Sequence, residues 1–419
     1  MGRAILNPRV MVISTNKWPM SARIPLSLSK IGFNVAVVST RTSVMREITG
    51  IDAHYDFYSR SASRSIVRAI EDWSPDLLVC SDDRAVEELH QLYVFSNNNK
   101  GQTIVDLIEA SLGDPAGFET ARDKSKFLMF AQSVGVRCPN TVVLPTDHFP
   151  ERELDVGPFP AVLKVDRSSS GRGVRFAYDK HSARSAFWEI QLPPNYPDAL
   201  KRAFARAVVT LPSRWGPLRR RTVSRQQPIV GRPANCALVC LGGRVLAGIS
   251  VEAIQTHSCC GPATVVQVID NLEITATAET LVERLNLSGF IGFDFILDAA
   301  GHAWLLEMNP RVTATSHLCA GSINLCAALW NRLTGSMAEL PASRIQSELA
   351  IALFPQELQR CLYSPYLGHV YHDVPWDQPK YVEACLRSAL RLHSFKRALG
   401  PLLGFEKPSP QRPRPFVKG

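Results

Sequence analysis

The residues best suited to chemistry in this chain lie in one segment, residues 289–311, GFIGFDFILDAAGHAWLLEMNPR. Apolar side chains alternate around Asp294, and a second apolar run contains Glu307. The short glycine-containing stretch between the two runs predicts a β-hairpin. With the turn near Gly301, we expect Asp294 opposite Glu307, with about 5 Å between their Cβ atoms. Asn309 follows Glu307 by two residues and should therefore point to the same face.

Two carboxylates and a carboxamide on one face of a hairpin form a ligand set for a hard cation. Mg²⁺ takes oxygen ligands and leaves positions for phosphate oxygens. Arg311 continues the alternation, where its fixed positive charge would suit a transferring phosphoryl group or a substrate carboxylate. The alternative is a half-buried hairpin whose polar side chains face solvent. We favour the metal site, because large apolar residues flank Asp294 and Glu307, and carboxylates within apolar strands need partners.

The pattern FDF followed by EMNPR resembles the ATP-grasp superfamily, in particular its carboxylate–amine ligases. It is similar to the ATP-grasp domains of carbamoyl-phosphate synthase and biotin carboxylase. In these proteins a strand acid and a Glu-x-Asn motif on the next strand hold Mg²⁺ against the phosphates of ATP. The resemblance implies that Asp294, Glu307 and Asn309 bind Mg²⁺, two ions rather than one, with Mn²⁺ as an alternative. It also implies a catalytic role for Arg311.

The superfamily supplies its other ATP contacts in a fixed chain order, and matching segments occur upstream in that order. Lys124, in RDKSK, resembles the lysine that reaches the nucleotide phosphates. Lys164 ends the apolar strand FPAVLK, and the resemblance implies that it binds ATP and acts in catalysis. The small residues that follow expose backbone N–H groups that can wrap phosphate oxygens, although a Ser/Gly cluster alone is usually a surface loop. The loop residues implied in ATP binding are Ser169, Ser170, Gly171 and Gly173.

A further matching segment, VSRQQPIVG at residues 223–231, resembles the hinge between the two ATP-grasp lobes. The resemblance implies that the adenine hydrogen-bonds to backbone here, with Gln226, Gln227 and Ile229 lining the slot. Two positions depart from the usual pattern. Gln227 replaces a glutamate, and Pro233 falls where many members carry an acid that binds the ribose. The nucleotide pocket is therefore expected without those ribose contacts.

The segment EAIQTHSCCGPAT, residues 252–264, is similar to a loop that lies beside the acceptor substrate in such ligases. The substrate-binding residues implied are His257, Gly261, Pro262 and Arg311. His257 is a candidate base, although a lone histidine is more often structural. We expect Cys259 and Cys260 to be packing thiols, since no nearby residue in the sequence is obviously arranged to lower a thiol pKa.

The elements that must position these side chains begin with alternating strands and helices. Short β-rich runs alternate with helical stretches at residues 10–14, 19–31, 34–38, 63–73 and 76–80. This rhythm predicts a parallel sheet with right-handed crossovers. The first strand is not followed by G-x-G-x-x-G, which argues against a dinucleotide site. Asp82 and Asp83 follow a strand, where α/β sheets bind ligands, but we favour a plain loop role for them.

The expected fold class is mixed α/β and α+β. It comprises an N-terminal parallel-sheet, Rossmann-like pre-ATP-grasp domain, a two-lobed ATP-grasp fold and a mostly helical C-terminal extension. The expected divisions are 1–105 for the N-terminal domain, 106–230 for the linker and lid subdomains with a basic insertion at 191–225, 231–335 for the metal-binding subdomain, 336–405 for the helical extension and 406–419 for a disordered tail. A chain of 419 residues is too long for one core, which agrees with this division.

The insertion accounts for most of the net charge of +9, because residues 201–225 hold eight basic residues and no acid. A solvated helical hairpin is the commoner fate of such a run, but we lean slightly towards a surface that gathers an anionic substrate. Nucleic acid is not favoured, since no recognised binding module is present. No apolar run approaches the ~20 residues that span a bilayer, and the N-terminus lacks a signal-peptide pattern. Ten scattered cysteines indicate free thiols in a reducing cytoplasm.

Together these motifs predict an ATP-dependent ligase. It would activate a substrate carboxylate as an acyl phosphate and couple it to an amine or similar nucleophile, releasing ADP and phosphate. The expected partners are small-molecule carboxylate and amine substrates, and a homodimer is compatible with the sequence. Two alternatives stay open: an ATP-grasp small-molecule kinase, and a nucleotide-responsive binding protein without turnover.

Overall fold

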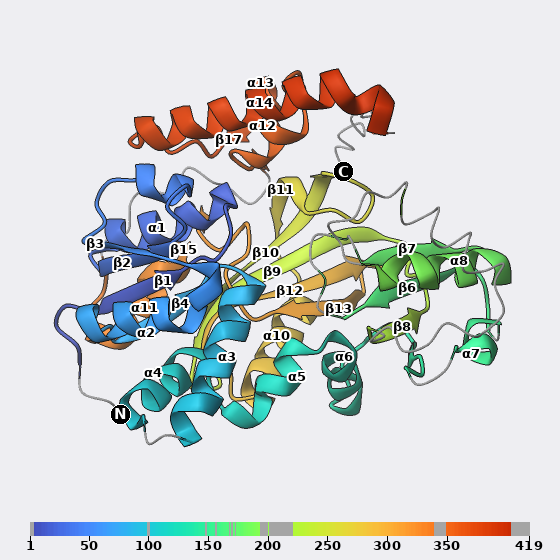
Figure 1. Cartoon of the computed structure of the whole chain (residues 1–419), viewed down its shortest axis with the longest axis horizontal. Coiled ribbons are helices and arrows are strands. Elements are labelled where there is room, and N and C mark those ends of the chain that lie inside the picture. The colour runs from blue at the N-terminus through green and yellow to red at the C-terminus, as the bar shows by residue number, and fades with distance from the viewer. Residues whose placement is uncertain are drawn as a thin grey trace.

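The computed structural model describes residues 4–98, 101–146, 149–155, 157–166, 168, 171, 173–192, 200, 221–338 and 349–403. The positions Ser169 and Ser170, most of the basic insertion and the C-terminal tail lie outside these ranges. Within them, four sheets and the helices that cover them make up the fold (Figure 1). No helix in the described ranges is both long enough and apolar enough to cross a membrane.

The N-terminal unit is a four-stranded parallel sheet in the order β3-β2-β1-β4. This confirms the parallel sheet predicted from the alternating pattern. Strands β1, β2 and β4 are mostly buried apolar runs because both faces of the sheet are covered. The strands are β1 (Arg9–Ile13), β2 (Asn34–Ser39), β3 (Ala53–Asp56) and β4 (Leu77–Cys80), and the helices are α1 (Arg23–Ile31), α2 (Ala62–Trp73), α3 (Asp83–Asn98) and α4 (Gln102–Leu112).

Helix α4 packs against β4, and the Ser111 hydroxyl accepts a 2.8 Å hydrogen bond from the Leu78 backbone N–H. The domain boundary that we expect at residue 105 falls within this helix and stays a prediction. Gly113 ends α4 with φ 97° and ψ −156°, a conformation open essentially to glycine alone. It forms a β-bridge with Leu287, which joins the N-terminal unit to the next part of the chain.

A small antiparallel sheet, in the order β5-β8-β6-β7, lies at the other end of the molecule (green in Figure 1). Helix α8 packs on it around Phe187, forming a separate apolar core. The elements from α5 to β8 are α5 (Phe118–Arg122), α6 (Lys124–Ser133), β5 (Thr141–Val143), α7 (Glu151–Asp155), β6 (Ala161–Val165), β7 (Val174–Ala177), α8 (Lys180–Gln191) and β8 (Val223–Gln226).

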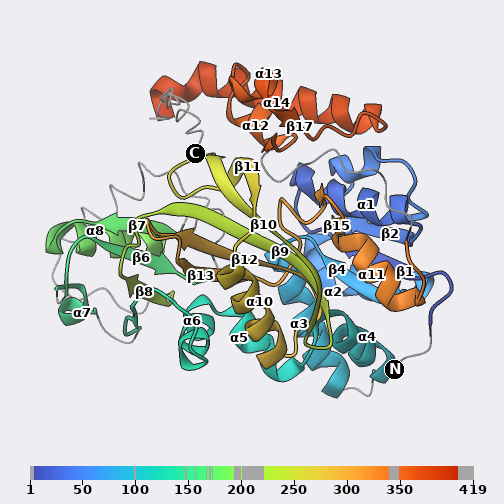
Figure 2. The same cartoon turned by 180° about the vertical axis from the view of Figure 1, so that it is seen from behind.

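A seven-stranded sheet, in the order β13-β12-β9-β10-β11-β16-β17, forms the centre of the molecule. One of its faces packs on α6 and α10, and the other on the N-terminal unit and α11, as Figure 2 shows from behind. The elements are β9 (Arg232–Leu241), β10 (Arg244–Thr256), β11 (Ala263–Ile269), α10 (Leu272–Arg284), β12 (Gly289–Leu297), β13 (Ala303–Asn309), β14 (Cys319–Ala320), β15 (Ile323–Asn324) and α11 (Leu325–Thr334).

The C-terminal extension is mostly helical, as expected, but it also adds two short strands to the edge of the central sheet. Tyr381 on α14 is fully buried in the core shared by the N-terminal unit and the central sheet, and its hydroxyl donates to the Pro19 carbonyl at 3.1 Å. The extension therefore ties the two units together. Its elements are β16 (Ala350–Ala352), α12 (Gln356–Arg360), α13 (Tyr366–His369), β17 (Tyr371–His372) and α14 (Pro379–Leu403).

Candidate active site

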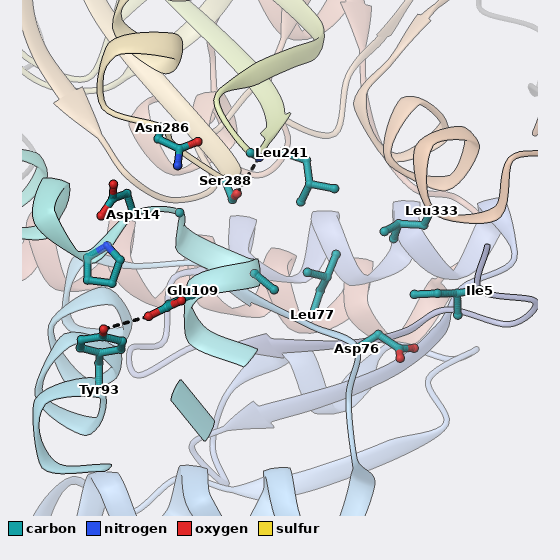
Figure 3. A pocket seen from close by; sticks show the side chains of 14 residues that line it. Ile5, Asp76, Leu77, Tyr93, Glu109, Asp114, Leu241, Asn286, Ser288 and Leu333 are labelled. Carbon is teal, nitrogen blue, oxygen red and sulfur yellow. Dashed lines mark hydrogen bonds between the residues drawn. The ribbon is translucent and has the colours of Figure 1, made fainter. Parts of the chain in front are cut away.

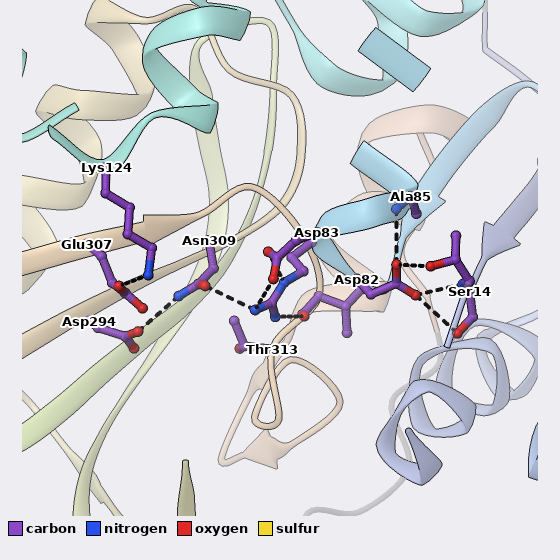
Figure 4. Close-up of polar contacts among 12 residues, drawn as sticks. Ser14, Asp82, Asp83, Ala85, Lys124, Asp294, Glu307, Asn309 and Thr313 are labelled. Carbon is purple, nitrogen blue, oxygen red and sulfur yellow. Dashed lines mark hydrogen bonds and ion pairs between the residues drawn. The ribbon is translucent and has the colours of Figure 1, made fainter. Parts of the chain in front are cut away.

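The hairpin β12–β13 has the geometry predicted from its sequence. Asp294 is the direct cross-strand partner of Glu307, and Gly292 is the partner of Asn309. The turn closes where Gly301, at φ 86°, donates its N–H to the Asp298 carbonyl at 3.0 Å. Both carboxylates therefore lie side by side on one face of the central sheet (Figure 4).

Asp294 is held by two amide side chains. The Nδ2 groups of Asn235 and Asn309 donate to its two oxygens at 2.6 and 2.9 Å. Burial and then the charge of Glu307 raise the pKa of Asp294, the two amides lower it, and the net value is about 6. Asn235 lies opposite Asp294 on β9 and was missed in the sequence. A polar residue inside the apolar strand RPANCALVCL was the available signal.

Two lysines from other elements face these acids. Lys124, the first residue of α6, forms an ion pair with Glu307. Burial disfavours the ionised form of Glu307, but Lys124 and Lys164 outweigh it and hold the pKa of Glu307 below its ordinary value. Lys164 comes from β6 of the small sheet. Burial lowers the pKa of Lys164. Attraction to Glu307 raises this pKa, and repulsion from Lys124 lowers it further. Among the described residues, Lys164 forms no ion pair within 4 Å.

The N-terminal unit reaches the same site through Asp83. Arg311 donates from Nε to Asp83 Oδ1 at 2.6 Å and from Nη2 to Asn309 Oδ1 at 3.1 Å (Figure 4). Asp83 is half-exposed, whereas the Arg311 side chain is 15% exposed. Asp82 next to it is buried. It accepts bonds from the Thr15 backbone and hydroxyl, both at 2.7 Å. Asp82 thus has a structural role that supports the β1–α1 connection, whereas Asp83 contacts the hairpin arginine.

Of the expected phosphate loop, Gly171 and Gly173 are described. Gly171 has φ 71°, and a Cβ added to it would lie 2.1 Å from the carbonyl oxygen of Cys260. Gly171 therefore lies directly against the connection between β10 and β11. His257, Gly261 and Pro262 lie in that connection, and the His257 N–H donates to the Pro262 carbonyl at 2.9 Å. His257 is exposed.

The hinge expected at 223–231 is the connection between the small sheet and the central sheet, from the end of β8 to the start of β9. Gln226 is buried, and within the described structure its Nε2 has no hydrogen-bond partner. The Gln227 N–H donates to the Asn140 carbonyl at 2.9 Å. Ile229 is partly buried. A buried amide without a partner is costly unless something supplies one, so Gln226 is suited to contact a bound molecule.

A cavity of about 820 Å³ lies elsewhere, between α4, the start of β4 and the β9–β10 turn (Figure 3). One wall carries Tyr93, whose hydroxyl donates to Glu109 at 2.9 Å. None of the residues expected for ATP lines it. It opens near Asp76, at the amino ends of the parallel strands, whereas Asp83 follows the carboxyl end of β4. Open α/β sheets bind ligands at carboxyl ends, which favours the acids over this cavity as the candidate site.

The described residues contain no group of three or more His, Cys, Asp or Glu side chains that could hold a metal. The site offers two carboxylates and the Asn309 amide instead. This set suits Mg²⁺, which is commonly held by one or two carboxylates together with substrate phosphates.

Comparison with known proteins agrees with this geometry. Residues 218–315 match the ATP-grasp domain family. The chain has an ATP-grasp fold. That match covers the hinge, the central strands and the hairpin acids. A comparison with curated proteins finds no match.

Solved structures share the ATP-grasp fold over most of this chain. One is the biotin carboxylase domain dimer of Hydrogenobacter thermophilus 2-oxoglutarate carboxylase with MgADP, ADP and bicarbonate, at TM-score 0.57, 14% identity, and coverage of 83% of this chain and 74% of that chain. Another is L-amino acid ligase from Bacillus licheniformis, at TM-score 0.52, 14% identity, and coverage of 78% and 75%. A third is N5-carboxyaminoimidazole synthase from Aspergillus clavatus with ADP and 5-aminoimidazole ribonucleotide, at TM-score 0.55, 15% identity, and coverage of 82% and 80%.

Proposed function

We propose that this protein is an ATP-dependent carboxylate–amine ligase. The observation that carries the proposal is the charge arrangement at the hairpin. Two adjacent carboxylates face two lysines: Lys124 forms an ion pair with Glu307, whereas Lys164 forms no ion pair within 4 Å in the described structure. A partly buried ammonium needs an anion, and the phosphates of ATP would provide it. The similar structures include ligases and carboxylases, and several contain ADP or ATP.

The metal-holding residues in this proposal are Asp294, Glu307 and Asn309. The raised pKa of Asp294, caused by burial and then by Glu307, is the sign of two carboxylates that lack sufficient positive charge nearby. Bound Mg²⁺, which we take to be two ions with Mn²⁺ as an alternative, would neutralise charge on the β- and γ-phosphates. Asn235 and Asn309 would orient Asp294 for this role through the hydrogen bonds that their side-chain amides donate to it.

The remaining nucleotide contacts follow the chain. Lys124 and Lys164 would bind the phosphates together with backbone N–H groups of Gly171 and Gly173. Ser169 and Ser170, outside the described residues, belong to the same proposal. Gln226, Gln227 and Ile229 would line the adenine slot, where the free Nε2 of Gln226 is a donor.

In the first chemical step, an oxygen of the substrate carboxylate attacks the γ-phosphorus of ATP. The bond to the β-bridging oxygen breaks, which yields an acyl phosphate and ADP. Lys164 would stabilise the negative charge on the transferring group. In the second step an amine attacks the acyl carbon, loses a proton, and expels phosphate to leave an amide. Arg311, held between Asn309 and Asp83, would bind the substrate carboxylate and the oxyanion.

We also propose that the acceptor side of the site is formed by His257, Gly261, Pro262 and Arg311. The basic insertion at 191–225 would gather an anionic substrate. Both substrates would be small molecules, and a cytoplasmic location and a homodimer belong to the same proposal.

A substrate panel tests the function. The purified chain is incubated with ATP, Mg²⁺ and pairs of carboxylates and amines, and ADP, phosphate and coupled product are measured. The ligase requires both substrates for product and releases ADP and phosphate in equal amounts. A kinase would form a phosphorylated product and ADP without free phosphate. A binding protein would form neither product, although it would still bind MgATP in a titration.

A further inference from the structure

Two adjacent cysteines lie beside the proposed phosphate site, and the ligase mechanism does not use them. Cys259 and Cys260 are at the tip of the β10–β11 connection, with their sulfur atoms 3.7 Å apart. Cys259 is exposed and Cys260 is partly buried. All ten cysteines of the chain are free thiols in this structure, and Cys259 is the exposed one.

The local backbone explains why the two thiols meet. The Gly261 N–H donates to the Ser258 carbonyl at 3.1 Å, which closes a four-residue β-turn with both cysteines at its centre. The Thr256 hydroxyl also donates to the Ser258 carbonyl at 2.7 Å and braces the turn. The turn is therefore a preformed dithiol rather than two unrelated packing residues.

This turn contacts the proposed nucleotide site in two ways. The Cys260 carbonyl lies against Gly171, so closely that a Cβ at Gly171 would be 2.1 Å from it. The positive charges of Lys164 and Arg175 also act on the Cys260 thiol. A change in the backbone of the turn must therefore move either Gly171 or the carbonyl that it touches.

We propose that Cys259–Cys260 is a reversible thiol-oxidation site, closed to a vicinal disulfide by small-molecule disulfides, and that closure weakens nucleotide binding. The second half rests on the proposed function, because it assumes that Gly171 and Lys164 bind phosphates. The chemistry of the thiols does not depend on it.

The oxidation balances with a disulfide R–S–S–R as the oxidant. The Cys259 thiolate attacks one sulfur, forming a mixed disulfide and releasing the first thiol. The Cys260 thiolate then attacks the Cys259 sulfur, closes the ring and releases the second thiol. Two protein thiols are oxidised by two electrons, and the disulfide is reduced to two thiols. Cys259 reacts first because it is exposed. The pKa of the Cys260 thiol is raised to about 11 by burial and then by its neighbour, so Cys260 is less often the attacking thiolate.

The product would be easily reduced. Adjacent Cα atoms are about 3.8 Å apart across a trans peptide, whereas unstrained disulfides span about 4.4–6.8 Å. A vicinal disulfide must therefore distort the turn, and strained disulfides are the labile, regulatory ones. The same distortion would displace the Cys260 carbonyl from Gly171.

Peptide mapping tests the chemistry. The full-length chain is treated with oxidised glutathione, alkylated with N-ethylmaleimide and digested with trypsin. The peptide from Val245 to Arg284 contains these two cysteines and no others. After oxidation we expect this peptide to carry neither maleimide nor glutathione and to have a mass 2 Da below that of the dithiol form. Dithiothreitol should restore the dithiol mass. Cys361, a partly buried thiol without an adjacent cysteine, serves as the control in the same digest. Two maleimide groups on the peptide, or a persistent glutathione adduct, would overturn the proposal.

Calorimetric titration with MgADP tests the coupling. We expect the dissociation constant to rise at least about tenfold on oxidation, to recover with dithiothreitol, and to be insensitive to the oxidant in Cys259→Ser. An unchanged constant in a chain whose disulfide has been mapped would overturn the coupling. If the reduced chain does not bind MgADP at all, the proposed function fails, while the peptide map still decides the thiol chemistry.

Discussion

Single residues in the candidate site are arranged so that each charge depends on its neighbours. Glu307 stays ionised because Lys124 and Lys164 outweigh the effect of burial, whereas Asp294 is pushed towards its neutral form by burial and by Glu307. The site therefore leaves Asp294 short of positive charge, and it leaves Lys164 without an ion pair within 4 Å among the described residues. Mg²⁺ and ATP phosphates would satisfy both shortages together, which is why the pattern suits a metal–nucleotide complex.

Replacing Glu307 by Gln should lower kcat by at least about 10³-fold, because the change removes a negative charge expected to bind Mg²⁺ and leaves Lys124 without its partner. Steady-state ADP release measures this, and circular dichroism checks that the fold is intact. Glu279→Gln is the matched control, since Glu279 is exposed on α10 and should leave the rate unchanged. Turnover at the wild-type rate in Glu307→Gln would exclude the acid cluster as the metal site.

Asp166, directly after β6, should make stability depend on pH. Burial and a hydrogen bond with Asp123 raise the pKa of Asp166 to about 7. The folded state thus binds a proton more tightly than the unfolded state. The contribution of protonated Asp166 to the free energy of unfolding is therefore complete below about pH 4 and is lost as the pH rises through 7. Asp166→Asn imitates the protonated acid and should stabilise the protein by about 1–2 kcal/mol at pH 8. Its effect should be smaller at pH 5, which lies nearer to the unfolded pKa than to the folded pKa of about 7.

Urea unfolding of wild type and Asp166→Asn at the two pH values provides the measurement. A stability difference that is the same at pH 5 and pH 8 would show that Asp166 does not titrate between them.

At the scale of elements, the site depends on close backbone contacts between units that are distant in the sequence. The end of α4 is one such contact. Gly113 bridges Leu287, and the Asp114 N–H donates to the Asn286 carbonyl at 3.1 Å. A Cβ at Gly113 would lie 2.2 Å from that same carbonyl oxygen. Here the requirement for glycine comes both from the local backbone conformation and from the segment that connects α10 to β12.

Gly113→Ala should destabilise the protein by about 3 kcal/mol or more, since backbone strain of about 1–3 kcal/mol is joined by a steric clash. Gly135→Ala is the control. Gly135 also has positive φ, 83°, but nothing lies within 4 Å of its added Cβ, so it should cost only about 1–2 kcal/mol. Both values come from urea unfolding. Equal losses in the two variants would mean that the clash at the α4–β12 junction relaxes freely.

At the scale of the whole molecule, the C-terminal extension secures the N-terminal unit to the central sheet. Asp373, 4% exposed, accepts a bond from Arg23 on α1 at 3.2 Å and lies 2.6 Å from His317 Nε2. The Thr49 N–H also donates to the Gln378 side chain at 2.8 Å. In Figures 1 and 2 the extension lies across the N-terminal unit and the central sheet, which is the position that these contacts require.

Asp373→Ala should destabilise the protein by about 3–5 kcal/mol, because it leaves the buried Arg23 without its partner. Asp377→Ala is the exposed counterpart. Its pair with Lys30 has both side chains about half exposed, at 50% and 52%, and should contribute less than about 1 kcal/mol. Thermal and urea unfolding compare the two variants. A loss below 1 kcal/mol in Asp373→Ala would refute the anchoring role of the extension.

The sequence by itself determined the parallel N-terminal sheet, the hairpin register and the ATP-grasp fold. The first two follow from local periodicity, whereas the ATP-grasp fold was implied by the resemblance of several ordered motifs to that superfamily. Alternating apolar residues and a glycine turn are sufficient to place Asp294 opposite Glu307, and short apolar strands alternating with helices are sufficient for a parallel sheet. The helical character of the C-terminal extension was likewise visible in its local pattern.

Only the tertiary structure decided which distant residues meet. Asn235 contacts Asp294 because β9 pairs with β12, and Asp83 contacts Arg311 because the N-terminal sheet packs beside the hairpin. Strands β16 and β17 join the central sheet through pairing that their short sequences do not specify. Such contacts depend on strand order and on the packing of whole units. No local pattern of residues encodes these, so the partners of each charge could be known only once the chain was folded.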